Sequence, residues 1–205
     1  MPSILVCQLP KSDDIDVLKA QMKPMKEVRL RSLKQDPESF CSRYENEVDQ
    51  PDEFWIDRLR PKHVHHFVAI AVEEGMSQEG LAVMDEQTEF LAFMVVVNEH
   101  TSQFTVDKGE NELPIYSLSA LWVDPLLRGQ GIGSKIVRRS IDWIKKHASE
   151  HNLQKARYRL AAKAGNDRAT KLYTNLGFSV VPVRLNEEEV EHDITIAMEM
   201  ILNLG

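Results

Sequence analysis

The sequence predicts a single α/β layered domain over residues 1–205, with a mostly antiparallel sheet flanked by helices. Strand-like and helix-like segments alternate along the whole chain. Neighbouring strand-like segments near both ends favour hairpins, and helix-like segments between strands in the second half favour crossover connections. A hydrophobic content of 42% with 28% charged residues is typical of a folded globular domain, and 205 residues can enclose a core.

The chain begins with one predicted strand and one long predicted helix. Residues 4–9 are apolar and are followed by a proline, which predicts a short strand. Ser12 precedes two aspartates and is a typical helix cap. Apolar residues then recur at helical spacing as far as Leu33. Pro24 lies inside this segment, so we expect it to kink or split the helix.

The next part of the chain predicts a short helix and two strands. Residues 34–52 are polar and should form an irregular connection that overhangs a cleft, and a helix is expected around residues 54–59. Residues 66–72 and 90–97 are apolar enough for two strands. Residues 98–114 are polar and should form a surface loop.

The second half predicts four strands and two helices. The strands are expected at residues 115–123, 158–161, 178–183 and 194–200, and the helices at residues 132–148 and 166–176. Gly177 should end the second of these helices. The acidic run at residues 187–191 is expected to be a solvated loop.

The charge balance restricts the class of partner. The net charge is −7 and the isoelectric point is about 5.5, so the surface repels phosphate backbones and anionic lipid headgroups. Nucleic acid and membranes are therefore unfavourable partners, and a cationic acceptor such as an amine is slightly favoured. The first residues lack the pattern of a signal peptide, and no run of about 18 apolar residues occurs, which predicts a cytoplasmic protein.

Neither the cysteines nor the histidines predict a metal site. Cys7 and Cys41 do not have the number or the spacing of a disulfide framework or a zinc site. His63, His65 and His66 are close in sequence, but alternation at the start of a strand should divide them between two faces. We therefore expect no bound metal.

A glycine-rich segment is the strongest functional signal in the chain. Residues 126–137 read LLRGQGIGSKIV, with Gly129, Gly131 and Gly133 between a predicted strand and a predicted helix. The first amides of a helix have no intrahelical acceptor and attract anions, and glycine lets a phosphate approach them closely. The segment therefore predicts a pyrophosphate site, with Arg128 as an additional cation.

Three ligand classes could use such a site. A nucleoside-triphosphate loop needs glycine followed by lysine and then serine or threonine, and here Ser134 precedes the lysine. A dinucleotide site needs a different glycine spacing directly after its strand, although Glu150 lies near the position of the required acid. Coenzyme A is the third class, because its 3′,5′-ADP pyrophosphate suits the same amides.

Two sequence blocks resemble the GNAT superfamily of N-acetyltransferases. The first is LWVDPLLRGQGIG at residues 121–133, and the second is NDRATKLYTNLGF at residues 166–178. The blocks lie in the order and at the separation that the family uses. Residues 28–40 and 54–59 also look like the first two helices of many members, so the resemblance covers nearly the whole chain.

The resemblance implies a fold, a co-substrate and a set of site residues. The expected fold is a GNAT-like mixed sheet of six or seven strands, with acetyl-CoA in a splay between the fourth and fifth strands. The implied coenzyme-binding residues are Leu121, Trp122, Val123, Arg128, Gly129, Gln130, Gly131, Ile132, Gly133, Ser134 and Asn166. The strand backbone at the first three would pair with the pantetheine arm, and the loop would hold the pyrophosphate. Tyr173 would lie near the thioester sulfur as the catalytic acid.

The implied activity is direct transfer of an acetyl group from acetyl-CoA to an amine. Many members of the family have a glutamate base on the fourth strand, but residues 115–123 offer only Tyr116, Ser117 and Ser119. Ordered water, Glu99 or His100 could remove the amine proton instead. The acceptor itself, which could be a small amine or a peptide or protein amine, is not indicated.

Other interpretations of the same residues stay open. A catalytically silent acyl-CoA-binding or regulatory module would also keep the glycine loop, and a dinucleotide-dependent oxidoreductase is a more distant alternative. Asn166 could be only a helix cap, and Tyr173 only a half-buried aromatic residue. Trp122 fits a core position better than an acceptor platform. Lys135 and its basic neighbours fit a solvated helix face.

Overall fold

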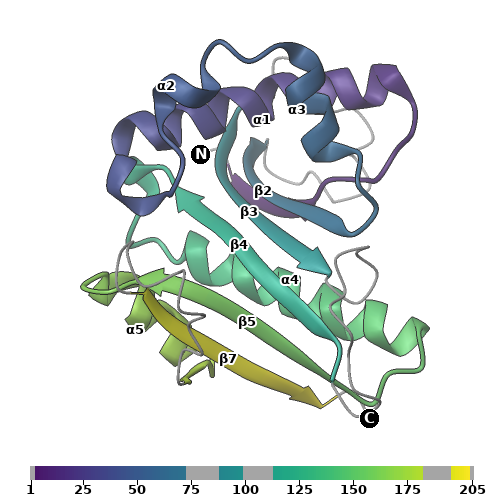
Figure 1. Cartoon of the computed structure of the whole chain (residues 1–205), viewed down its shortest axis with the longest axis vertical. Helices are drawn as coiled ribbons and strands as arrows, with labels where there is room; N and C mark the ends of the chain where they lie inside the picture. The colour runs from purple at the N-terminus through teal and green to yellow at the C-terminus, as the bar shows by residue number, and fades with distance from the viewer. Residues whose placement is uncertain (1–2, 73–87, 99–112, 182–194, 204–205) are drawn as a thin grey trace, which may run out of the picture. The chain divides into compact units, whose positions relative to one another are not determined.

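The computed structural model describes residues 3–72, 88–98, 113–181 and 195–203, and Figure 1 shows their helices and strands. The strands are β1 (Ser3–Gln8), β2 (Val64–Val72), β3 (Phe90–Asn98), β4 (Ile115–Val123), β5 (Lys155–Lys163), β6 (Ser179–Val180) and β7 (Thr195–Asn203). The helices are α1 (Ile15–Gln35), α2 (Tyr44–Glu47), α3 (Asp52–Leu59), α4 (Ile132–Glu150) and α5 (Asp167–Asn175). Most of the predicted 98–114 loop, including Glu99 and His100, and the acidic run at residues 187–191 lie outside the described residues.

The strands form one seven-stranded sheet in the order β1-β2-β3-β4-β5-β7-β6. β1 pairs with β2, β5 with β7, and β6 with β7, all antiparallel, whereas β4 and β5 run parallel. A mixed sheet of this kind, flanked by helices, confirms the predicted fold class. The chain also divides into two compact units, of which unit 1 comprises Met1–Val96 and Ala120–Arg139, and unit 2 comprises Val97–Ser119 and Ser140–Gly205.

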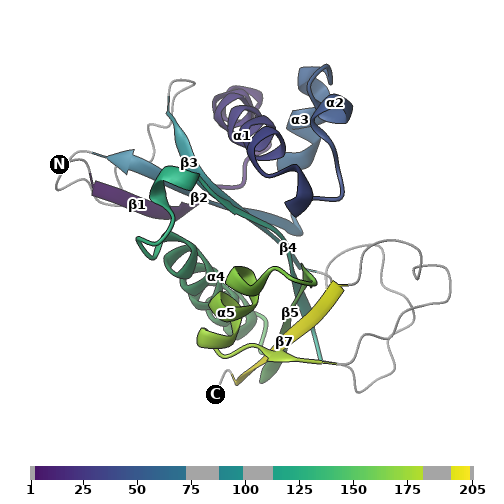
Figure 2. The same ribbon diagram turned by 90° about the vertical axis from the view of Figure 1, so that its left-hand side faces the viewer.

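Unit 1 has a helical layer over its strands. Figure 2 shows α1, α2 and α3 on one face of β1, β2 and β3, and the beginning of α4 on the opposite face. The helical layer is held by apolar side chains at the expected helical spacing, which are buried against strand residues. This core includes Leu18, Met22, Met25 and Val28 of α1, Trp55, Ile56 and Leu59 of α3, Val68 and Ile70 of β2, and Phe93 of β3.

The beginning of unit 1 differs from the sequence prediction at three points. Asp14, not Ser12, is the N-cap of α1, and its carboxylate accepts from the amides of Asp16 and Val17. The hydroxyl of Ser12 instead accepts from the amide of Asp14. Pro24 lies within α1, which continues through it as one helix, so the expected split does not occur. The predicted irregular connection over residues 34–52 contains the short helix α2.

An ion-pair triad around the buried carboxylate of Glu47 joins α1, α2 and α3. Glu47 of α2 is 1% exposed and accepts from Arg29 of α1, at 3.1 Å from Nε and 2.8 Å from Nη2. Arg58 of α3 donates to the same carboxylate at 3.0 Å. Burial alone would raise the pKa of Glu47, but hydrogen bonds from Arg29 and Ser42 and the two arginine charges lower it from 4.5 to about 2. The polar connection is therefore fixed by charge as well as by apolar packing.

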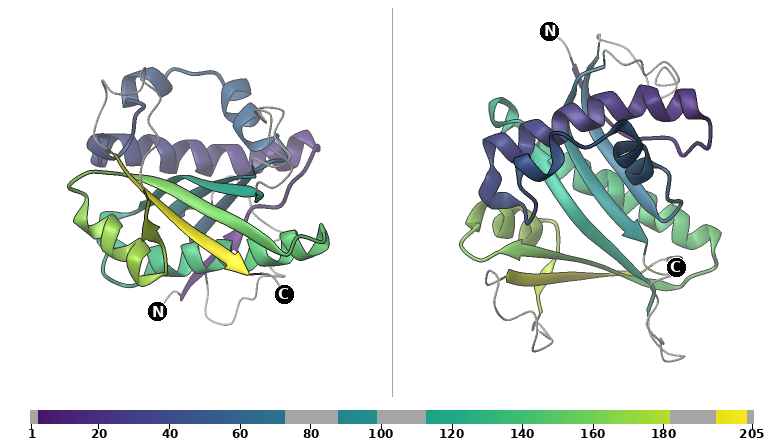
Figure 3. Two further views of the ribbon diagram at one scale, coloured as in Figure 1. Left: turned by 60° about the horizontal axis from the view of Figure 1, so that its bottom comes forward. Right: turned by 45° about the horizontal axis from the view of Figure 1, so that its top comes forward.

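Unit 2 is built on two long paired strands. β5 and β7 pair over nine residues each, from Lys155 opposite Asn203 to Lys163 opposite Thr195. The figures show α5 and the second half of α4 on one face of these strands (Figures 2 and 3). On that face the buried hydroxyl of Tyr158 lies 2.9 Å from that of Ser140 on α4. β5 is longer than the predicted strand at residues 158–161.

Replacing Glu47 by Gln tests the triad. The folded-state pKa is lower than the unfolded one, so the carboxylate stabilises the fold above about pH 4.5, and this contribution disappears as the pH falls toward 2. We expect Glu47→Gln to lower the free energy of unfolding at pH 7 by on the order of 3 kcal/mol, with a smaller difference at pH 3. Urea unfolding of both proteins at the two pH values measures this. An equal loss at both would show that the charge is not responsible.

Candidate functional site

The connection from β4 to α4 is a tight turn in unit 1. Asp124 follows β4, and its carboxylate accepts from the amide of Leu126 at 3.0 Å, which starts a single 3-10 turn over Pro125–Leu127. Gly129 and Gly131 follow with φ angles of +80° and +79°. The first helical hydrogen bond of α4 runs from the amide of Lys135 to the carbonyl of Gly131 at 3.0 Å.

The two glycines are required by backbone conformation. A φ near +80° is strained for residues with a side chain, whereas glycine adopts it readily. A Cβ added at Gly129 or Gly131 would meet no atom within 4 Å, so the space above both residues is open. Gly133 is different, because it lies inside the first turn of α4. The turn therefore exposes its main chain on the side where these side chains are missing.

The beginning of α4 is suited to an anion. The amides of Ile132, Gly133 and Ser134 precede the first helical hydrogen bond, so helix geometry offers them no acceptor. No acidic residue lies in the first turn to compensate the positive end of the helix dipole. Together with the two open glycine positions, these amides can approach a phosphate oxygen without a side chain in between.

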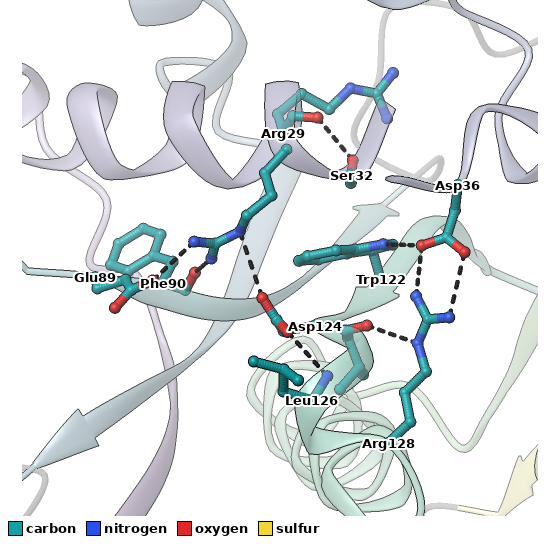
Figure 4. A network of polar contacts seen from close by, with 11 residues as sticks. Arg29, Ser32, Asp36, Glu89, Phe90, Trp122, Asp124, Leu126 and Arg128 are labelled. Carbon is teal, nitrogen blue, oxygen red and sulfur yellow. Dashed lines mark hydrogen bonds and ion pairs between the residues drawn. The ribbon is translucent and has the colours of Figure 1, made fainter. Parts of the chain in front are cut away.

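Arg128, at the head of the turn, is held by an acidic residue that the sequence does not single out. Its guanidinium makes a bidentate ion pair with Asp36, the residue that follows α1, and its Nε donates to the carbonyl of Val123 at 3.0 Å (Figure 4). Burial opposes the charge on Asp36, but the hydrogen bonds from Arg128 and Trp122 and the arginine charge lower its pKa. Arg128 therefore fixes the turn to α1, and its charge is largely neutralised there.

Asp36 also fixes the end of β4. The indole Nε1 of Trp122 donates to Asp36 at 2.7 Å, and Trp122 is 3% exposed. Its ring lies 6.5 Å from that of Phe93 within the core of unit 1. This burial confirms the predicted core position of Trp122. Its neighbours Leu121 and Val123 are half-buried.

A second ion pair ties the same turn to α1. Arg31 lies 3.6 Å from the carboxylate of Asp124 and 2.7 Å from that of Glu89, and it also donates to the carbonyl of Phe90. Asp124 is the residue that begins the 3-10 turn. The last turns of α1 thus contact the segment after β4 at both of its ends.

In unit 2, Asn166 is the N-cap of α5. Its side-chain oxygen accepts from the amide of Ala169 at 3.1 Å, as expected for a cap. Gly177 ends the helix with a φ of +96°, which confirms the predicted stop. A role of Asn166 in coenzyme binding stays a prediction, because its carbonyl oxygen is engaged in capping.

Tyr173 lies on the buried side of α5. It is 5% exposed, and its ring packs edge-on against that of Phe178 with centroids 5.7 Å apart. Burial raises the pKa of its phenol well above the usual value of 10. The hydroxyl is therefore protonated at all physiological pH values and can act as a hydrogen-bond donor. Tyr158, on the neighbouring strand β5, is buried in the same way but bonds to Ser140.

Other candidate groups have structural roles. His65 and His66 are consecutive residues of β2 and are both buried, because both faces of this strand are covered. Burial and nearby positive charges, including Lys11, lower the pKa of His66 to about 3. Burial raises the pKa of Cys7 to about 12, which makes its thiol unreactive. Over the described ranges, no three His, Cys, Asp or Glu side chains are grouped as a metal site.

A double-mutant cycle tests whether Asp36 and Arg128 hold the turn together. We expect Asp36→Asn, Arg128→Gln and the double variant to give a coupling in unfolding free energy of about 1 kcal/mol, because the pair is bidentate but partly exposed. Asp57 and Arg60 form an exposed pair and serve as a control, for which about 0.3 kcal/mol is expected. A coupling no larger than the control would contradict the assigned role.

Comparison with known proteins agrees with this arrangement. The sequence pattern of the Acetyltransferase (GNAT) family matches residues 28–178, which is more than half of the chain. Comparison with curated protein sequences gave no significant match. No helix in the described ranges has the length and apolar character needed to span a membrane.

Solved structures share the fold at low sequence identity. An acetyltransferase of the GNAT family from Streptococcus pneumoniae has a TM-score of 0.59 at 14% identity, covering 98% of this chain and 100% of that one. NAA60 from Arabidopsis thaliana in complex with a bisubstrate analogue has a TM-score of 0.58 at 15% identity, covering 97% and 100%. NAA60 in complex with acetyl-CoA has a TM-score of 0.57 at 13% identity, covering 97% and 99%. With the family match over residues 28–178, this chain belongs to the GNAT family of acetyltransferases.

Proposed function

We propose that this protein is an acetyl-CoA-dependent N-acetyltransferase that transfers the acetyl group directly to an amine. The observation that carries the proposal is the turn before α4, with two glycines at positive φ, open space above them and no acid in the first helical turn. Acetyl-CoA would supply the activated thioester. Neither cysteine is suited to a covalent intermediate, because Cys7 is buried with a raised pKa and Cys41 lies outside both sequence blocks.

The main chain of the turn would hold the coenzyme. In this proposal the amides from Gly129 to Ser134 bind the pyrophosphate, and the backbone of residues 121–123 pairs with the pantetheine arm. The structure of NAA60 with acetyl-CoA supports the same co-substrate for this fold. Open space at Gly129 and Gly131 fits such a ligand, because a larger residue at either position would fill the approach to the amides.

Arg128 contributes to this site mainly by holding the turn in place, and not by its charge. Two of its nitrogens face Asp36 and the third donates to Val123, so its positive charge is already compensated. We expect the backbone amides and the helix dipole to provide most of the attraction for the pyrophosphate. Lys135 and Arg138 are exposed on α4 and could contribute additional charge.

The acceptor amine must lose a proton before it can attack. An alkyl amine with a pKa of about 10.4 is neutral in only about one molecule in 2,500 at pH 7. β4 has no acidic residue to accept this proton. Proton removal through ordered water is therefore our working mechanism, and a peptide amino terminus, with a pKa near 8, needs it least.

Tyr173 is proposed to stabilise the departing thiolate. A thiol has a pKa of about 8.5, whereas burial raises that of Tyr173 above its usual value, so complete proton transfer from phenol to sulfur is unfavourable. Donating a hydrogen bond to the thiolate is not subject to this penalty. We therefore assign Tyr173 as a hydrogen-bond donor to the leaving group rather than as a strong acid.

A catalytically silent acyl-CoA-binding module is the second candidate. It is favoured by one observation, which is that β4 has serines and apolar residues but no carboxylate. Such a protein would keep the turn before α4 and bind the coenzyme without turnover. The two candidates therefore differ in catalysis and not in coenzyme binding.

Coenzyme binding and amine-dependent thiol release together test the proposal. We expect calorimetry to show binding of acetyl-CoA, and thiol release to increase with at least one member of a panel of polyamines, aminoglycosides, amino acids and peptides. Gly131→Glu should abolish binding, because it adds a negative charge and a Cβ at a φ of +79°. Gly177→Glu introduces the same residue at a comparable φ of +96° away from the turn and should retain binding.

The outcomes separate the candidates. Binding without release for any amine would favour the silent module, and absence of binding would contradict both.

Replacing Tyr173 by Phe tests the donor. Phenylalanine keeps the ring contact with Phe178, so the fold and the coenzyme affinity should be preserved. We expect kcat to fall about ten- to a hundredfold, and the dissociation constant of the coenzyme to change by less than about twofold. Tyr158→Phe is the matched control, since it also removes a buried hydroxyl, and it should lower stability without lowering kcat. Wild-type turnover by Tyr173→Phe would exclude the proposed role.

A further inference from the structure

Two exposed cations lie on α4 directly after the turn that precedes the helix. The amide of Lys135 donates to the carbonyl of Gly131, so Lys135 is one helical turn beyond that glycine, and Arg138 follows on the same face of the helix. Both residues are exposed, whereas Ile136 and Val137 between them are buried. The part of α4 nearest the turn therefore presents two positive charges to solvent.

The side chains of these two cations are directed back toward the turn. Each Cα–Cβ bond of an α-helix tilts toward the N-terminal end of the helix. At 1.5 Å per residue, the Cα atoms of Lys135 and Arg138 lie about 6 and 10 Å along the axis from Gly131, which long side chains largely span. Both cations can therefore reach a charged group beside the turn.

Neither charge is compensated by a partner. In the part of the chain that the structure describes, no ion pair or side-chain hydrogen bond involves Lys135 or Arg138. α4 has no acid before Asp142, which follows Arg138 by one turn. Arg128, by contrast, is neutralised by its ion pair with Asp36. The first half of α4 thus has two cations that are available to an anionic ligand.

Coenzyme A has a second phosphate group that the turn does not account for. Its adenosine end is a 3′,5′-ADP, in which one ribose joins the pyrophosphate to a phosphate monoester. When the main-chain amides hold the pyrophosphate, the 3′-phosphate lies only one ribose away from them, within the range of the two side chains. A phosphate monoester has a charge of about −1.5 to −2 at neutral pH and makes strong hydrogen bonds with lysine and arginine.

We propose that Lys135 and Arg138 bind the 3′-phosphate of the coenzyme and make the protein select acetyl-CoA over its analogue without this phosphate. This inference rests on the proposed function and specifies which form of the coenzyme the site takes. The main-chain amides of the turn contact only a pyrophosphate, which many nucleotides share. The two cations add the contact that distinguishes coenzyme A from these other nucleotides.

A solvated helix face without a ligand is the competing explanation. Lys145 and Lys146 are also exposed on α4, and Lys146 lies 4.0 Å from Glu150. Lys145 is ten residues, or nearly three turns, beyond Lys135 on the same helix. Physiological salt screens most of the effect of an exposed charge over such a length. The two lysine pairs therefore resemble each other in charge and exposure and differ in their distance from the turn.

Calorimetry with acetyl-CoA and with acetyl-dephospho-CoA, which lacks only the 3′-phosphate, tests the inference. We expect the wild-type protein to bind acetyl-CoA about tenfold more tightly at low ionic strength, the effect of two partly exposed charge contacts, and the ratio to fall with added salt. Lys135→Gln combined with Arg138→Gln should bring the ratio close to one, and should change the affinity for the dephospho form by less than about twofold. Lys145→Gln combined with Lys146→Gln removes the same charge farther along α4 and should keep the preference.

The outcomes separate this inference from the proposed function. Binding of neither form by the wild-type protein would contradict the proposed function itself. Equal affinity of the wild-type protein for the two forms would overturn only the role of the 3′-phosphate. A preference that survives in the Lys135 and Arg138 double variant would overturn the assignment to these residues, and so would an equal loss of affinity for both forms. Thermal unfolding of each variant checks that α4 is intact.

Discussion

The geometry of the turn after β4 depends on one carboxylate. Asp36, at the end of α1, accepts from the guanidinium of Arg128 and from the indole of Trp122, so it fixes the head of the turn and the last part of the strand before it. Arg31 and Asp124 add a second ion pair from the same helix. Because these contacts are made by side chains, the main-chain amides at the start of α4 stay available. The end of α1 thus helps to position the main-chain amides at the start of α4, although none of these amides belongs to α1.

The distribution of charge matters more than its sum. A net charge of −7 predicts repulsion of anions, yet the screening length of about 8–10 Å at physiological salt leaves each site governed mainly by its own neighbours. The start of α4, for example, has no acid in its first turn. Elsewhere opposite charges are paired, as in the contacts of the buried Glu47 with Arg29 and Arg58. An acidic protein can therefore still offer a local site that attracts an anion.

Features set by local rules were predictable from the sequence. Alternating and helical patterns indicated most strands and helices, the glycines indicated the turn before α4, and Gly177 indicated a helix end. Contacts between distant segments were not predictable. Asp36 lies 92 positions before Arg128, and α2 is held by charge pairs that no periodicity reveals.

A turn that binds its ligand through main-chain amides tolerates many side-chain substitutions, because the binding groups themselves are not replaced. The side chain of Leu126, which is 87% exposed, can change while the amide directions stay the same, since those directions depend on the φ angles of Gly129 and Gly131. Alanine scanning, which asks what each side chain contributes, would pass over most of this segment as tolerant. What must be kept here is the backbone conformation, and it depends on the lack of a side chain at Gly129 and Gly131.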